Sequence, residues 1–262
     1  LVADGGVLVL TSVSSVGLAP NLIRRMLADW LVDDIPGFEQ KTDAIVSAYK
    51  PHLATLESMT RTPVDWVQDN MLNPAYLSLC LEVRLILEDA GAGFSVLGSS
   101  PSLSTDWRWF KALHGAGRVF DQHYLDQYDR NCHNFVDHRF LLPEISATTS
   151  AELQRAARTL LEAAVAQRSA LDQGSANAAA EARTRATEAV LSLTSHDSAL
   201  AQDTIAGLHE ALSLLSRREP PSISDVAGAQ RFGAVFGRET LYLSLQCTGS
   251  SVPSTTGPVD AP

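Results

Sequence analysis

The first twelve residues constrain the fold of this chain more than any other stretch. Asp4-Gly5-Gly6 has the composition of a tight turn, because glycine adopts the positive φ angles that such a turn needs. The continuous apolar run from Val7 to Leu10 is typical of a central strand covered by helices on both faces. The run ends in hydroxyl residues, at the end of the strand where open α/β sheets bind ligands. Because the sequence opens on this strand, we expect the preceding strands of its sheet to lie upstream of Leu1.

Two further segments are predicted to be strands. Residues 94–97 follow a glycine-rich turn and are apolar at three of four positions. In residues 240–246 leucine alternates with polar or aromatic side chains, which is the period of two that a half-buried strand shows. The chain therefore contains at least three extended segments that lie far apart in sequence.

These segments resemble class I S-adenosylmethionine-dependent methyltransferases. Residues 1–12, LVADGGVLVLTS, are similar to the fifth strand of that fold, and residues 86–98, ILEDAGAGFSVLG, to the helix, turn and sixth strand. Residues 236–244, FGRETLYLS, look like the approach to the last, antiparallel strand. The resemblance implies an α/β fold: a partial Rossmann-like methyltransferase sheet, strand order 5-7-6, with a large helical insertion.

On this basis the chain divides into four parts. Residues 1–104 are expected to form the C-terminal half of a Rossmann-like domain, and residues 105–220 a helical substrate region. Residues 221–247 complete the sheet with a last helix and strand, and the Ser/Thr/Pro/Gly-rich residues 248–262 are predicted to be disordered. Within the helical region, the apolar spacing predicts helices at 150–173, 176–195 and 197–217.

Composition excludes several classes of function. The net charge of −10, without an extended basic cluster, argues against nucleic-acid binding. Cys80, Cys132 and Cys247 are odd in number and far apart, which argues against a disulfide scaffold or a structural zinc site and favours a cytoplasmic setting. No apolar run approaches 18 residues, so we expect no membrane-spanning helix.

The densest group of chemically active side chains lies between residues 105 and 139. If residues 120–139 form one helix, amides and a histidine share a face at steps of four, three and four. Such a face is typical of a pocket for a polar substrate, with a histidine as general base. The predicted catalytic residues are His133 and His138, with Asn131 and Asn134 binding the substrate.

Structural roles are an alternative for the same residues. The asparagines and Asp137 would then bond neighbouring loops, with the histidines as half-buried partners. A metal site formed by His123, His133, Asp137 and His138 is chemically possible, but the spacing matches no known signature and we predict none.

Four more residues are predicted to bind substrate. Ser12 and Ser14 lie where the resemblance places the substrate, although serines also simply terminate strands. Asp106 and Trp107 follow the second strand and would form a lid, or else a helix start with a core tryptophan.

The predicted function is methyl transfer from S-adenosylmethionine to a polar small-molecule or sugar-like acceptor. No glycine-rich cofactor loop follows a predicted strand, so we expect cofactor binding in the full-length protein only and no activity in this chain alone. The alternative is a non-catalytic helical interaction module, and another Rossmann-like enzyme such as a dehydrogenase stays open. The sequence does not indicate an oligomeric state.

Overall fold

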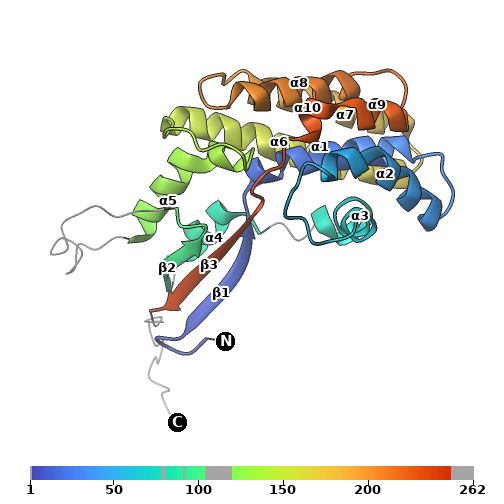
Figure 1. Cartoon of the computed structure of the whole chain (residues 1–262). Helices are drawn as coiled ribbons and strands as arrows, with labels where there is room; N and C mark the ends of the chain where they lie inside the picture. The colour runs from blue at the N-terminus through green and yellow to red at the C-terminus, as the bar shows by residue number, and fades with distance from the viewer. Residues whose placement is uncertain (1, 78–80, 91–92, 104–119, 249–262) are drawn as a thin grey trace, which may run out of the picture.

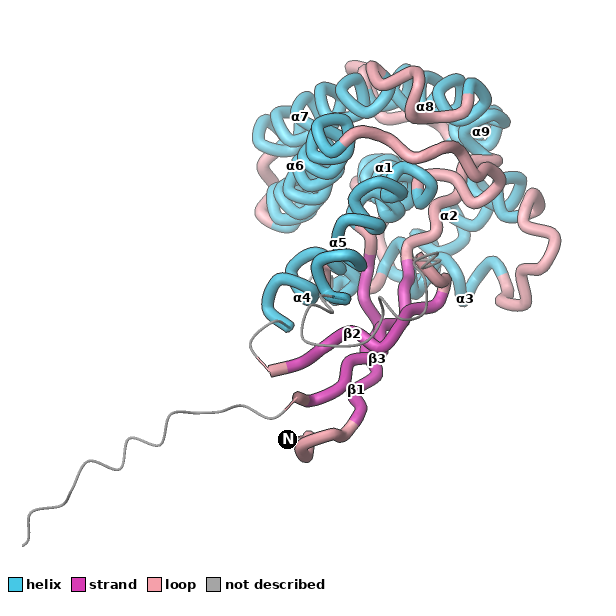
Figure 2. Tube along the Cα trace, turned by 90° about the vertical axis from the view of Figure 1, so that its left-hand side faces the viewer, coloured by secondary structure: helices cyan, strands magenta, loops and turns pink. Residues whose placement is uncertain are grey.

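The computed structural model describes residues 2–77, 81–90, 93–103 and 120–248. Helices dominate it, and a small sheet projects from one side of the helical body (Figures 1 and 2). The predicted lid residues Asp106 and Trp107, and nearly all of the predicted disordered tail, lie outside the described residues. Among the described residues no helix combines the length and apolar character needed to cross a membrane.

The sheet consists of three strands, and the three segments predicted from the sequence form them. They are β1 (Val7–Val13), β2 (Phe94–Ser100) and β3 (Thr240–Cys247). The order is β1-β3-β2, with β3 antiparallel to both neighbours. Leu243 at the centre of β3 lies opposite Leu10 on one side and Ser99 on the other.

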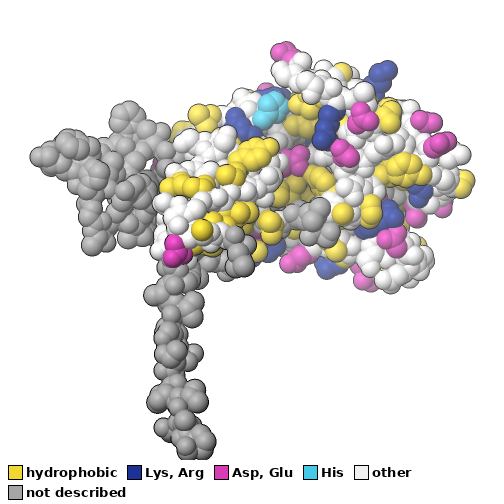
Figure 3. Space-filling model, turned by 90° about the horizontal axis from the view of Figure 1, so that it is seen from below, with side chains coloured by type: hydrophobic (Ala, Val, Ile, Leu, Met, Phe, Trp, Pro, Cys, Tyr) yellow, Lys and Arg dark blue, Asp and Glu magenta, His cyan; other side chains and the backbone are white. Residues whose placement is uncertain are grey.

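The predicted partial Rossmann-like sheet is wrong. Residues 240–246 do lie between the other two segments, but in the described residues the sheet consists of three antiparallel strands alone, and β1 is at its edge rather than central. Val7 and Val9 are 54% and 62% exposed, whereas Leu8 and Leu10 pack against the core, so helices cover one face of β1 only. Figure 3 shows hydrophobic side chains gathered where the strands project. The chain is a helix-rich α/β fold, because a four-residue apolar run does not reveal how many of its faces are covered.

Helix α1 (Ser15–Leu31) joins the sheet to the helical body. It begins directly after β1, and sixteen of its seventeen residues are buried. On one side it packs against α6 (Ala147–Asp172), which pairs with α7 (Ala176–Thr194), and α7 contacts α8 (Gln202–Leu215). Alanines line the facing surfaces of α6 and α7, so the bias towards alanine in this region allows the two helices to pack closely.

Shorter helices complete the body around α1. They are α2 (Phe38–Leu53), α3 (Pro63–Val67) with a π-helical turn at Gln68–Leu72, a 3-10 turn at Pro74–Leu77, α4 (Val83–Ala90), α5 (Phe120–Asn131) with a 3-10 turn at Cys132–Phe135, α9 (Ile223–Gly228) and α10 (Gln230–Gly233). The single helix considered over residues 120–139 is therefore wrong, because α5 ends at Asn131.

Two hydrophobic cores lie on either side of α1. The larger joins α1 to the inner face of the sheet and to α6, α7 and α8, and so spans the predicted boundaries at residues 104 and 220. The smaller lies between α1, α2, α3 and α9. Buried Arg24 of α1 lies beside the smaller core, where its Nη2 donates to the carbonyls of Phe232 at 3.0 Å and Val235 at 2.8 Å. Its guanidinium also lies 3.8 Å from the ring centre of Phe236.

Candidate functional site at the end of strand β1

Ser12 and Ser14 have structural partners. The Ser12 hydroxyl donates to the carbonyl of Leu241 at 3.3 Å across the sheet. Ser14 is the N-cap of α1: its Oγ accepts from the backbone N–H of Gly17 and lies 3.0 Å from the hydroxyl of Tyr128. These bonds fix the turn from β1 into α1. The predicted substrate contacts of both serines stay predictions.

Asn134 holds a loop together. Its Nδ2 donates to the carbonyl of Leu142 at 3.1 Å, and its Oδ1 accepts from the N–H of the same residue at 2.7 Å. Asn131 donates to the carbonyl of Gln127, one turn earlier in α5. Both asparagines line a cavity of about 310 Å³ that also includes Leu103, next to residues outside the described ranges. The structural alternative therefore accounts for the amide of Asn134.

The two predicted catalytic histidines have different environments. His133 is 2% exposed, and burial lowers its pKa below the usual value. The carbonyls of Pro143 and Leu142 oppose this lowering, although neither ring nitrogen makes a hydrogen bond of normal geometry. The cavity beside His133 holds about 10 Å³, which is roughly the minimum for one water molecule. A substrate therefore has no room at His133 in this conformation.

His138 lies on the exposed surface. Its Nδ1 is 3.1 Å from the carbonyl oxygen of Phe236, and its backbone N–H donates to the same oxygen. Asp137 is engaged by Arg139 through two side-chain hydrogen bonds and by the hydroxyl of Thr204 at 2.7 Å. No group of three potential metal ligands occurs in the part of the chain that the structure describes. The catalytic roles of both histidines stay predictions that this geometry does not support.

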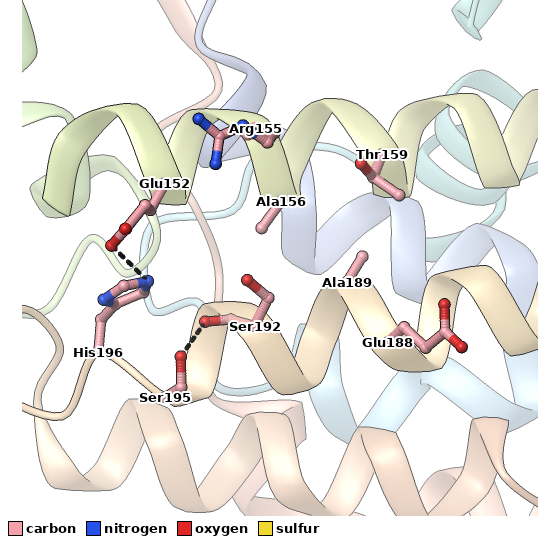
Figure 4. A pocket seen from close by; sticks show the side chains of 9 residues that line it. All are labelled: Glu152, Arg155, Ala156, Thr159, Glu188, Ala189, Ser192, Ser195 and His196. Atoms are coloured by element: carbon pink, nitrogen blue, oxygen red, sulfur yellow. Dashed lines mark hydrogen bonds and ion pairs between the residues drawn. The ribbon is translucent and has the colours of Figure 1, made fainter. Parts of the chain in front are cut away.

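Another hollow lies between α6 and α7 (Figure 4). It holds about 480 Å³, and His196 lies beside Glu152 with Nε2 3.7 Å from Oε2. The hydroxyl of Ser195 donates to the carbonyl of Ser192 at 2.7 Å, so it is not directed at the histidine. The hollow is an open groove in which His196 and Ser195 already have partners.

A smaller cavity at the carboxyl end of β1 has a different character. We call it the Ser15 cavity; it holds about 250 Å³ and is lined by Val13, Ser15, Leu18, Glu82, Leu85, Arg158 and Leu161. The start of α1 forms its buried side, and Leu85 of α4 and Arg158 of α6 stand at its exposed rim. Its wall is mostly apolar. Apart from Arg158, the polar residues that line it are Ser15 and Glu82, which come from different segments of the chain.

Two oxygen atoms in this wall lack hydrogen-bond partners. The Oγ of Ser15 and the Oε1 of Glu82 are both buried, and no described group hydrogen-bonds either atom. The other carboxylate oxygen of Glu82 lies 3.5 Å from Nη2 of Arg158, a long contact for an ion pair. A buried polar atom without a partner costs about 1–3 kcal/mol, and two such atoms belong to residues that line this cavity, which makes it the candidate site.

The sequence predicted ligand binding at this end of the strand, but it gave no indication of Glu82. The Glu82 segment reaches the site because the N–H of Val13 donates to the carbonyl of Leu81, a parallel bridge between residues far apart in sequence. No local motif marks Glu82. Ser15 belongs to the serine-rich stretch after β1, which was the available signal.

Comparison with known proteins identifies no family. No family model matches the chain, and neither the curated proteins nor the solved structures give a significant match. The geometry of the described residues therefore carries the functional argument, together with the sequence resemblance.

Proposed function

We propose that this chain binds a small hydroxylated compound with an apolar body in the Ser15 cavity. The observation that carries the proposal is the pair of buried, unpartnered oxygens of Ser15 and Glu82 beside an apolar cavity. A cavity of ~150 Å³ admits benzene, so about 250 Å³ accommodates a substituted aromatic ring.

The two polar residues have complementary roles towards a hydroxyl group. The carboxylate of Glu82 accepts the hydroxyl hydrogen, while the hydroxyl of Ser15 donates to the ligand oxygen. Leu18 and Leu161 contact the apolar body. Because both oxygens are covered in this conformation, the ligand enters by displacing the exposed rim side chains of Leu85 and Arg158, the second of which gives up its 3.5 Å contact with Glu82.

Methyl transfer to such an acceptor is the reaction that the sequence resemblance supports. Glu82 would then receive the proton that the acceptor oxygen loses, which is the role of a general base. The cavity wall would also orient the acceptor, which is the second contribution of this chain to methyl transfer. The proposal replaces the predicted histidine bases with a carboxylate that lines a cavity of sufficient size.

The described residues do not fit S-adenosylmethionine. Gly17 is the glycine at the carboxyl end of β1, and a Cβ there would lie 2.5 Å from the carbonyl oxygen of Arg238. The absence of a side chain at Gly17 therefore lets α1 pack against the backbone at Arg238. The glycine does not serve the close approach of a cofactor. In the described part of the chain no strand is followed by a glycine-rich loop. Calorimetry of this chain with S-adenosylmethionine should accordingly show no micromolar binding.

The binding proposal is tested with p-cresol and its analogue p-xylene, which lacks the hydroxyl. Titration followed by NMR should show p-cresol binding about tenfold more tightly, the effect of one hydrogen bond to a charged group. Glu82→Gln and Ser15→Ala should each reduce this preference. Glu181→Gln removes an exposed carboxylate of α7 and should leave it unchanged. Equal binding of both compounds, or equal effects of Glu82→Gln and Glu181→Gln, would refute the proposal.

A further inference from the structure

A second hollow between α4, α5 and α6 carries positive charge in an acidic protein. It holds about 410 Å³, and its wall includes Arg84, Asp129, Ser150, Gln154, Arg155 and Arg158. We call it the arginine hollow. Its full lining contains three arginines and one aspartate, whereas the whole chain has a net charge of −10. The concentration of arginine in this hollow therefore opposes the charge of the chain as a whole.

Arg84 is held in a fixed position by its neighbours. Its Nη1 donates to both carboxylate oxygens of Asp129 at 2.7 Å, and its Nε lies 2.9 Å from Glu88. Asp129 also accepts from Nε2 of Gln154 at 2.9 Å, and the same nitrogen donates to buried Ser150. The single aspartate of the hollow is thus already engaged, and the network fixes one arginine in place.

The other two arginines are not fully neutralised. Arg155 makes no hydrogen bond or ion pair with any residue that the structure describes, and it is exposed. Arg158 has one contact with Glu82, at 3.5 Å, and its side chain is 50% exposed. Arg155 and Arg158 lie three positions apart on one face of α6, and both line the arginine hollow.

The first turn of α6 adds a favourable field. Ala147, Ser150 and Ala151 line the hollow beside the arginines. Helix N-termini carry a partial positive charge and favour anions. The small alanine side chains also leave the space that the hollow occupies. The helix end reinforces the arginines, which supply the charge and the hydrogen-bond donors.

We propose that the arginine hollow binds a phosphate-class oxyanion, either free phosphate or the phosphate group of a small ester. Arg155 and Arg158 donate to its oxygens in the manner typical of arginine and phosphate, while Arg84 is neutralised by Asp129 and Glu88 and forms part of the wall. Arg158 also lines the Ser15 cavity, so the two sites are neighbours. This inference does not depend on the proposed function, because the ligand chemistry differs and Arg158 is the one described residue that lines both sites, whereas Arg155 lines the arginine hollow and not the Ser15 cavity.

The test is calorimetric titration with inorganic phosphate and, separately, phenyl phosphate at constant ionic strength. Saturable binding is expected for the wild-type chain, with Arg155→Gln and Arg158→Gln each about tenfold weaker. Arg185→Gln is the matched control, because Arg185 is an exposed arginine of α7 away from the hollow and the same charge is lost. Arg155 has no described partner, so its replacement should leave the fold intact.

The outcomes separate the alternatives. Tighter binding of phenyl phosphate identifies an ester as the ligand class, and equal binding of the two probes identifies the free anion. Phosphate binding that fails to saturate, or that sodium chloride reproduces, would overturn the proposal. So would equal weakening by Arg155→Gln and Arg185→Gln, because the effect would then reflect net charge alone.

Discussion

His52 should make the stability of this protein fall as the solution becomes acidic. The imidazole is 1% exposed, and its Nε2 lies 2.8 Å from the carbonyl oxygen of Val226. Its Nδ1 is buried without a partner. The ring packs edge-on against Tyr49 and Phe232, with ring centres 5.3 and 6.0 Å away. This environment suits the neutral imidazole and has no place for a second proton.

Burial lowers the pKa of His52 from 6.5 to about 4, and the nearby positive charge of Arg24 acts in the same direction. Between pH 4 and pH 6.5, His52 is therefore protonated to a greater extent in the unfolded chain than in the folded chain. The contribution of His52 to stability is therefore complete above pH 6.5 and decreases as the pH falls towards 4. This linkage corresponds to a loss of roughly 2 kcal/mol at pH 5 and roughly 3 kcal/mol at pH 4.

The assay is urea unfolding followed by tryptophan fluorescence, for wild type and His52→Gln, between pH 7.5 and 4. Glutamine keeps a donor for the carbonyl of Val226 but does not titrate. Buried Asp29 and half-buried Glu239 have pKa values raised by burial, so their contributions have the opposite sign. They are the same in both proteins and cancel in the difference. We expect the stability advantage of wild type over the variant to shrink by about 2 kcal/mol between pH 7.5 and 5.

Parallel stability curves for the two proteins would refute this reasoning. That result would mean that His52 binds its proton equally well in the folded and unfolded chains. The ring would then have a partner or a path to water that the structure does not show. A variant that gains stability relative to wild type as the pH rises would reverse the predicted sign.

Three further substitutions test the packing around α1. Arg24→Met should cost about 3–5 kcal/mol in urea unfolding, because the backbone carbonyls that the guanidinium satisfies stay buried without it. Ser14→Ala should cost about 1–2 kcal/mol through loss of the helix cap and of the bond to Tyr128, and an unchanged unfolding midpoint would contradict these roles. Gly17→Ala should cost at least about 1–3 kcal/mol, because its Cβ would lie 2.5 Å from a backbone carbonyl oxygen. Gly228→Ala is the control for this change, since a Cβ there meets open space; equal melting temperatures for the two alanine variants would count against the packing argument.

The candidate site was only partly predictable. Ser15 lies in the serine-rich stretch that marks the end of β1, so this part of the proposed site belongs to a segment that the sequence singled out. Glu82 enters through the bridge between Val13 and the Glu82 segment, a contact between distant residues that no spacing rule indicates. His133 shows the opposite case, because its residue type suggested catalysis while its burial leaves no space for a substrate.

Local patterns in the sequence predicted the three strands and the long helices α6, α7 and α8, but not the end of α5 at Asn131. Glycine turns and alternating leucines identified the three strands, and apolar spacing identified the long helices, because each signal arises from neighbouring residues. The folded structure was needed to show that β1 lies at an edge of the described sheet and that Glu82 and Ser15 line one cavity. Distant segments of the chain decide whether a strand face is covered, and they also decide which groups lie beside a buried oxygen. Neither property is encoded in neighbouring residues. A local pattern such as Val7–Leu10 is compatible with either arrangement.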